Sequence, residues 1–134
     1  DMFLLGLWTG KASLDKLGAA GSYLMQAEGL SLLGGDALPL GILENVESGE
    51  KLMQLHQGDT LILLSDGVED AYENRQSMEE TIRDALTLET AQDAANAILT
   101  GAQSGDTAPA DDQTVLVLRL IRARVDAKIE EMYQ

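Results

Sequence analysis

Residues 57–68 read Gln-Gly-Asp-Thr-Leu-Ile-Leu-Leu-Ser-Asp-Gly-Val and contain the most informative strand of the chain. A Gly58-Asp59 turn leads into Thr60–Leu64, a short run that is apolar on both faces of a β-strand. Such a strand belongs in the interior of a sheet, because both of its faces must be covered. Asp66 and Gly67 follow at once, so a carboxylate stands at the end of a rigid element beside a residue that lets a ligand approach.

The residues before this run predict further strands, at 2–8, 11–17, 23–27, 30–33 and 51–56. Glu28-Gly29 lies between the third and fourth of these and is expected to form a two-residue hairpin turn. The last strand alternates apolar and polar residues and places His56, the single histidine, on its polar face. We interpret His56 as a surface residue and not as an acid catalyst.

The residues after the run predict two helices, a strand and a final helix. Ser77, with a glutamate three residues later, fits a capping box and predicts a helix that starts there, and a second helix is expected from about Thr90. Residues 114–121 predict a strand in which Arg119 packs its stem and keeps its guanidinium in solvent. Residues 122–134 have the pattern of a helical tail. The order indicates an α+β fold of largely antiparallel strands.

Composition and charge exclude several kinds of partner. The 134 residues match one domain, 45% of them are hydrophobic, and the absence of cysteine rules out disulfides and thiolate chemistry. No apolar run approaches the ~20 residues that a membrane helix needs. The net charge of -14 repels nucleic acid and anionic lipid and attracts divalent cations, although acidity also serves solubility alone. We therefore expect neither nucleic-acid binding nor membrane contact in this segment.

A second acidic position, Asp111-Asp112, comes just before the strand at 114–121. If that strand and Thr60–Leu64 are antiparallel neighbours, Asp66 and Asp111 converge at one end of the sheet. Two carboxylates at close range require a cation, and hard oxygen ligands suit Mg²⁺ or Mn²⁺. The alternative is that Asp66 belongs to an ordinary turn and Asp111-Asp112 to a solvated cap.

Three segments, which keep the family's order along the chain, resemble the SpoIIE-like phosphatases of the metal-dependent, type 2C superfamily. Residues 57–68 are similar to the family segment pGDxLlllSDGv, residues 111–118 to its closing strand DDxTvvvl, and residues 38–42, Leu-Pro-Leu-Gly-Ile, to its loop lPLGi. The resemblance implies part of an α-β-β-α sandwich, with two largely antiparallel sheets flanked by helices. It also implies a binuclear Mn²⁺ or Mg²⁺ site between the sheets.

The resemblance also implies roles for individual residues. Asp66 and Asp111 take the positions of metal ligands, and Asp112 takes the position of a group that orients Asp111. Asp70, near an accessory metal in some relatives, and Gly67 are lesser candidates. The implied reaction is hydrolysis of phosphoserine or phosphothreonine by a metal-activated water, with no phosphoenzyme.

The family pattern contains an upstream Asp-Gly pair whose aspartate bridges the metals, and the sole Asp-Gly pair of this chain is Asp66-Gly67. We therefore expect residues 1–121 to be the C-terminal half of a phosphatase domain that is inactive alone, followed by the tail at 122–134. The resemblance further implies a bacterial cytoplasmic domain, compatible with a membrane anchor upstream and with a homodimer at full length. Its implied substrate is a phosphorylated protein, in this family an anti-anti-sigma factor. The alternative function is a non-catalytic interaction module on the same fold.

Overall fold

The computed structural model describes residues 2–6, 9–16, 20–33, 49–105 and 111–121. The segments predicted as a loop at 38–42 and as a helical tail at 122–134 lie outside these residues. Strands come first, then helices, then one more strand, which is the order that the sequence predicts. The elements are β1 (Met2–Leu5), β2 (Lys11–Lys16), β3 (Ser22–Gln26), β4 (Gly29–Leu33), β5 (Gly49–Gln54), β6 (Thr60–Leu64), α1 (Asp66–Glu69), α2 (Arg75–Ala85), α3 (Ala91–Ala102) and β7 (Val115–Arg119).

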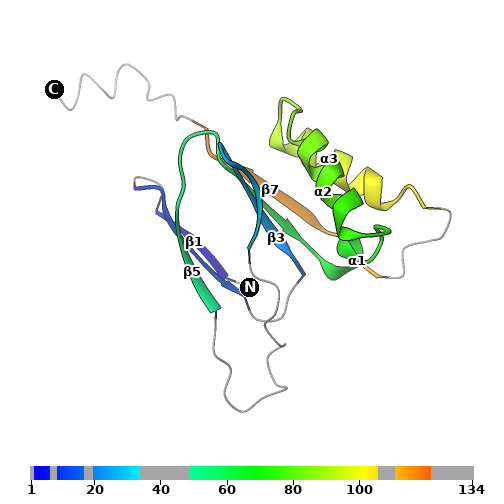
Figure 1. The fold of residues 1–134 in the computed structure, drawn as a ribbon, viewed down its shortest axis with the longest axis horizontal. Coiled ribbons are helices and arrows are strands. Elements are labelled where there is room, and N and C mark those ends of the chain that lie inside the picture. Colours follow the sequence, from blue (N-terminus) through cyan, green and yellow to red (C-terminus); the bar gives the residue numbers. More distant parts are fainter. Residues whose placement is uncertain (1, 7–8, 17–19, 34–48, 106–110, 122–134) are drawn as a thin grey trace, which may run out of the picture.

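The strands form two antiparallel sheets. One has the order β1-β2-β5 and the other the order β4-β3-β6-β7. Figure 1 shows β1 and β5 on one side of the larger sheet and α2 and α3 on the other. The predicted α+β class, with two antiparallel sheets and flanking helices, is confirmed. Among the described residues, no helix has the length and apolar character needed to cross a membrane.

Both faces of β6 contribute to a core, as its sequence predicts. Ile62 and Leu64 face the helices, whereas Leu61 faces the smaller sheet. The layer between the larger sheet and the helices is built around Tyr23, Ile62, Val68, Met78, Ile82 and Ile98, all fully buried. The layer between the two sheets is built around Leu14, Leu24, Leu33, Leu55 and Leu61. β6 therefore connects the two hydrophobic layers.

The start of α2 differs from the prediction. The N-cap is Asn74, whose side-chain oxygen accepts the Ser77 N–H at 2.9 Å, so the helix begins at Arg75 and Ser77 lies in its first turn. Glu80 accepts a hydrogen bond from Gln76 and does not reach back to the helix start. The capping box was therefore wrong, because asparagine caps a helix as well as serine and here comes earlier in the chain. The predicted start of the next helix is confirmed, with Thr90 as N-cap of α3.

The β3–β4 hairpin turns one residue earlier than predicted. Gln26 pairs with Gly29, so the two turn residues are Ala27 and Glu28. Gly29 is the first residue of β4 and has φ 131°, a conformation that favours glycine. The glycine therefore marks the residue after the turn.

The Arg119 guanidinium, which the sequence predicts to lie in solvent, is half-buried and bound to main-chain carbonyls. It donates hydrogen bonds to the carbonyl oxygens of Leu86, Leu88 and Glu89, at 3.2, 3.0 and 2.9 Å. These carbonyls follow the last turn of α2, where helical carbonyls lack partners within the helix and a positive charge is favourable. Arg119 thus fastens the α2–α3 connection to β7.

We expect Arg119→Met to lower the free energy of unfolding by about 1–3 kcal/mol, because the apolar stem is kept while three charge-assisted hydrogen bonds are lost. Urea unfolding followed by circular dichroism measures this change. The matched control is Arg83→Met, which removes only an exposed pair with Glu79 at 3.4 Å and should cost less than about 1 kcal/mol. Equal losses in the two variants would contradict the role given to Arg119.

Candidate metal centre

The antiparallel pairing of β6 with β7 brings the two predicted acidic segments together. Leu64, at the end of β6, is the register partner of Val115, at the start of β7. Asp66 follows the first of these strands and Asp111 precedes the second, so both segments lie at the same end of the sheet. Figure 1 shows α1, which begins at Asp66, beside the start of β7. The predicted neighbourhood of the two strands is confirmed.

Ser65 joins the two segments with three hydrogen bonds. Its main-chain N–H donates to the carbonyl of Thr114 at 3.0 Å. Its hydroxyl oxygen accepts the N–H of Thr114 at 2.9 Å and donates to the carbonyl of Asp112 at 3.1 Å. The hydroxyl thus continues the sheet pairing beyond the last residues of the strands.

Gly67 is the point of closest approach between the segments. A Cβ at this position would clash with the carbonyl oxygen of Asp112 and would lie 3.2 Å from the carbonyl carbon of Asp111. On the other side, the side-chain amide of Gln113 donates to the carbonyl of Gly67 at 3.1 Å. Only a residue without a side chain allows the Asp111 segment to pack this closely against α1.

The carboxylates of Asp66 and Asp111 are each oriented by the next main-chain N–H. Asp66 Oδ1 accepts from Gly67 at 2.9 Å, and Asp111 Oδ1 accepts from Asp112 at 2.7 Å. Both side chains are exposed, and within the described part of the chain neither forms an ion pair. Each therefore has one oxygen fixed by the backbone and another left for a further partner.

These residues fit a divalent cation as part of a ligand set. The available donors are carboxylate and carbonyl oxygens, the ligand type that Mg²⁺ and Mn²⁺ take. Asp66 and Asp111 are held on segments that hydrogen bonds connect, so their positions depend on one another. Within the described ranges, however, no three His, Cys, Asp or Glu side chains group closely enough to hold a metal. A cation held by Asp66 and Asp111 would therefore take its remaining ligands from groups other than these two side chains.

The lesser candidates differ in what they contact. Asp112 contacts Asp111 through its main-chain N–H, so the backbone rather than the carboxylate of Asp112 orients the predicted ligand. Asp70 is the C-cap of α1, and its side chain is exposed. His56 precedes β6 and is thus at the opposite end of that strand from Asp66, with 71% of its side chain exposed. This position agrees with its interpretation as a surface residue.

Sequence reasoning missed three residues that shape the site. Ser65 and Gln113 are adjacent in sequence to predicted positions, but nothing in their identity shows that their side chains cross between segments. Glu69 extends from α1 and accepts the N–H of Gly21, at the start of β3, at 3.2 Å. The short helix α1 was itself missed, because four residues carry no periodic pattern.

A half-buried and a buried tyrosine support the elements behind the site. Burial raises the pKa of Tyr72, whose hydroxyl donates to the carbonyl of Ile98 at 2.7 Å and so ties the segment after α1 to α3. Burial, with a smaller contribution from Glu79, raises the pKa of Tyr23 as well. Both hydroxyls are therefore neutral near pH 7, and neither is suited to act as a base there.

The fold and the paired strand ends define the class of protein. The phosphatase domain of the cell fate determinant SpoIIE from Bacillus subtilis, presoaked with Mn, matches with a TM-score of 0.71 and 23% identity over 92% of this chain and 56% of that one. The catalytic domain of the serine/threonine phosphatase PstP in complex with 2 manganese ions matches with a TM-score of 0.71 and 21% identity over 90% and 57%. PppA, described as a key regulatory component of T6SS in Pseudomonas aeruginosa, matches with a TM-score of 0.63 and 19% identity over 82% and 53%. The chain thus has the fold of the PP2C-type phosphatases.

The family itself is shown by sequence. The family model of Stage II sporulation protein E (SpoIIE) matches residues 4–121, and the chain belongs to this family. The chain spans a little over half the length of the solved structures named above. No curated protein matches it at a significant level.

We expect Gly67→Ala to lower the free energy of unfolding by about 1–3 kcal/mol, because the added methyl group meets the Asp112 carbonyl and forces α1 and the Asp111 segment apart. Thermal unfolding by calorimetry measures the loss. Gly105→Ala is the control: no atom lies within 4 Å of its added Cβ, and the change should stay within about 0.5 kcal/mol. If Gly67→Ala is as harmless as the control, the two segments are not in contact as described.

Proposed function

We propose that this chain is part of a metal-dependent protein serine/threonine phosphatase in which Asp66 and Asp111 bind one Mn²⁺ or Mg²⁺. The observation that supports the proposal most is the position of these two carboxylates, at the adjoining ends of β6 and β7, on segments joined through Ser65. Family membership and the shared fold support it independently.

The chemistry of the proposed site follows from its charges. When bound, the metal supplies activation of a water molecule and neutralisation of phosphoryl oxygens. The residues of this chain contribute the negative charge that holds the cation and the rigid strand ends that fix its position. Asp112 orients Asp111 through the main-chain N–H, and Gly67 orients Asp66 in the same way. Asp70 is a lesser candidate for an accessory ion.

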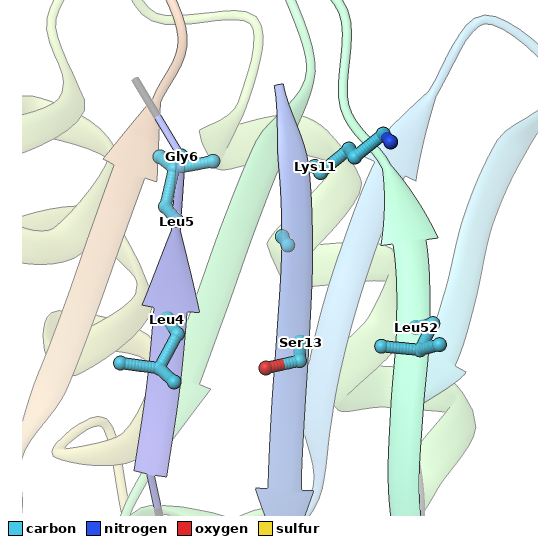
Figure 2. A pocket seen from close by; sticks show the side chains of 7 residues that line it. Leu4, Leu5, Gly6, Lys11, Ser13 and Leu52 are labelled. Carbon is cyan, nitrogen blue, oxygen red and sulfur yellow. The ribbon is translucent and has the colours of Figure 1, made fainter. Parts of the chain in front are cut away.

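We further propose that residues 1–121 form the C-terminal half of the phosphatase domain and do not hydrolyse substrate alone. One support is that the chain spans 56% of the matched Bacillus subtilis domain. Another is the outer face of the smaller sheet, where Leu4, Ser13 and Leu52 are register partners across β1, β2 and β5. These three side chains help to line an open hollow of about 380 Å³, and Figure 2 shows them side by side on neighbouring strands. Leu4 is 56% exposed and Leu52 75% exposed, so an apolar face is left without cover by the described residues.

The inner face of β7 adds a second apolar surface of the same kind. Leu116 and Leu118 pair with Leu63 and Leu61, whose side chains belong to the layer between the sheets, yet they are 56% and 38% exposed. In a two-sheet sandwich such residues face the opposite sheet. Further strands of the complete domain would cover them.

The substrate and setting are proposed from family membership. The substrate class is a phosphorylated protein, and an anti-anti-sigma factor is the specific candidate. We place the domain in the bacterial cytoplasm, compatible with a membrane anchor elsewhere in the protein and with a homodimer at full length. The net charge of -14 argues against nucleic acid as a partner.

We expect Leu52→Asn to be almost neutral for the 134-residue chain, where the side chain is already 75% exposed, but to cost about 1–3 kcal/mol in a protein extended to the full domain length. Chemical unfolding of both lengths gives the comparison. Leu88→Asn, at a residue 40% exposed beyond the end of α2, serves as control and should have the same effect in both lengths. An equal, small effect of Leu52→Asn in both lengths would mean that the extension does not cover this face.

In the full-length protein we expect Asp66→Asn and Asp111→Asn each to lower Mn²⁺-dependent turnover of a phosphoserine protein at least ~100-fold, because each removes a charge that holds the metal while preserving shape. Asp112→Asn should give an intermediate loss, because a negative charge next to Asp111 is removed while the N–H that orients Asp111 remains. His56→Ala should leave the rate nearly unchanged.

Asp84→Asn, on the exposed side of α2, is the matched control for loss of one negative charge and should leave turnover unchanged. Circular dichroism establishes that each variant is folded. Full activity in folded Asp66→Asn would overturn the site assignment. A wild-type protein that binds no Mn²⁺ and hydrolyses no phosphoserine substrate would favour the non-catalytic interaction module.

A further inference from the structure

The side chain of Gln113 crosses between the two acidic segments. Gln113 lies in the extended stretch between Asp112 and β7, is partly buried, and donates through Nε2 to the carbonyl oxygen of Gly67 at 3.1 Å. The opposite orientation of the amide would place two oxygens against each other, so the Gly67 carbonyl fixes which atom faces it. Gln113 therefore belongs to the Asp111 segment by sequence and contacts the Asp66 segment by its side chain.

This link differs from those made by Ser65. The three hydrogen bonds between Ser65 and the Asp111 segment hold the residue before Asp66. The Gln113 amide, in contrast, extends from the Asp111 segment to Gly67, the residue after Asp66, and donates a hydrogen bond to it. Asp66 is thus held on both sides, by Ser65 before it and by Gln113 after it.

Gly67 transmits this contact to the Asp66 carboxylate. Its N–H donates to Asp66 Oδ1 at 2.9 Å, while its carbonyl accepts from Gln113. If the carbonyl is released, Gly67 gains freedom to rotate, and the N–H that orients the carboxylate moves with it. The contact thus acts on the direction of the Asp66 oxygens.

The second polar atom of Gln113 indicates that this side chain adds little to stability. Oε1 is buried and has no hydrogen-bond partner among the described residues. The penalty of a buried acceptor without a partner is comparable to the gain from one intramolecular hydrogen bond. In Gln113 the stabilisation from the Nε2 hydrogen bond and the penalty for the unpaired Oε1 nearly cancel. The side chain therefore changes the free energy of folding little, and its main effect is to position Gly67.

We propose that Gln113 is a positioning residue, which sets the relative placement of the Asp66 and Asp111 carboxylates and thereby the affinity of the pair for a divalent cation. The inference rests on the proposed function, because it concerns the same cation site. It adds a residue that touches neither the metal nor the substrate.

The test compares Gln113→Met, which keeps the length and removes the donor, with Gln113→Asn, which keeps the amide but is one methylene too short to reach Gly67. Both are made in the full-length protein, and Mn²⁺ binding is measured by calorimetry. We expect the Kd for Mn²⁺ to rise about tenfold or more in both variants, the range usual for residues that orient metal ligands. The melting temperature should stay close to that of the wild type. Gln92→Met, an exposed glutamine of α3, is the control and should change neither quantity.

Amide hydrogen exchange in the metal-free protein supplies a second measurement. The N–H of Val68 shares its peptide group with the Gly67 carbonyl, so its exchange should accelerate in Gln113→Met and not in Gln92→Met. If wild type binds Mn²⁺ and both Gln113 variants bind it equally well, the inference is wrong while the proposed function stands. If wild type binds no Mn²⁺, the proposed function fails. If exchange at Val68 is unchanged in Gln113→Met, Gln113 does not restrain the Gly67 carbonyl and the inference is wrong. A large fall in melting temperature in Gln113→Met would assign the residue a structural role and also overturn the proposal.

Discussion

The antiparallel pairing of β6 with β7 is the interaction on which the rest of the structure depends. It places Leu64 opposite Val115, and the chain leaves each strand at the same end of the sheet toward an aspartate. β6 also pairs with β3 on its other edge and presents apolar side chains to both hydrophobic layers. A shift of one residue in this register would turn every side chain of β6 to the other face and separate Ser65 from Thr114. The register between β6 and β7 therefore fixes both the hydrophobic layers and the neighbourhood of the two acidic segments.

The acidic segments illustrate how a fold accommodates like charges. Asp66 and Asp111 each accept a neighbouring main-chain N–H, and both remain exposed to water, which lowers their repulsion. In each carboxylate one oxygen accepts a main-chain N–H, and the other oxygen is not engaged in that bond. The overall negative charge strengthens the attraction for a divalent cation and weakens that for polyanions.

The two sheets are covered unequally, and this inequality bears on function. Helices α2 and α3 cover one face of the larger sheet, whereas the face of the smaller sheet with Leu4 and Leu52 has no cover from the described residues (Figure 1). Leu116 on β7 is likewise exposed among the described residues. The solved structures that match the chain are longer, and the chain spans 56% and 57% of two of them. The exposed apolar faces are the observation behind the proposal that residues 1–121 form half of a domain.

Sequence patterns predict the fold class, the interior position of Thr60–Leu64, the two helices, and the placement of the Asp66 and Asp111 segments at one end of a sheet. These follow from local signals: apolar alternation, a polar residue at a strand end, and motifs that keep their order along the chain. Only the tertiary structure decided which groups cross between segments. Neither the Arg119 bonds to the end of α2, nor the Ser65 and Gln113 bridges, nor the Glu69 contact with Gly21 has a sequence signature. Each depends on two residues that are at least 30 positions apart, and their distance is set by packing. Local choices between similar residues, such as Asn74 over Ser77 as helix cap, were settled in the same way, because both side chains satisfy the same backbone N–H groups equally well.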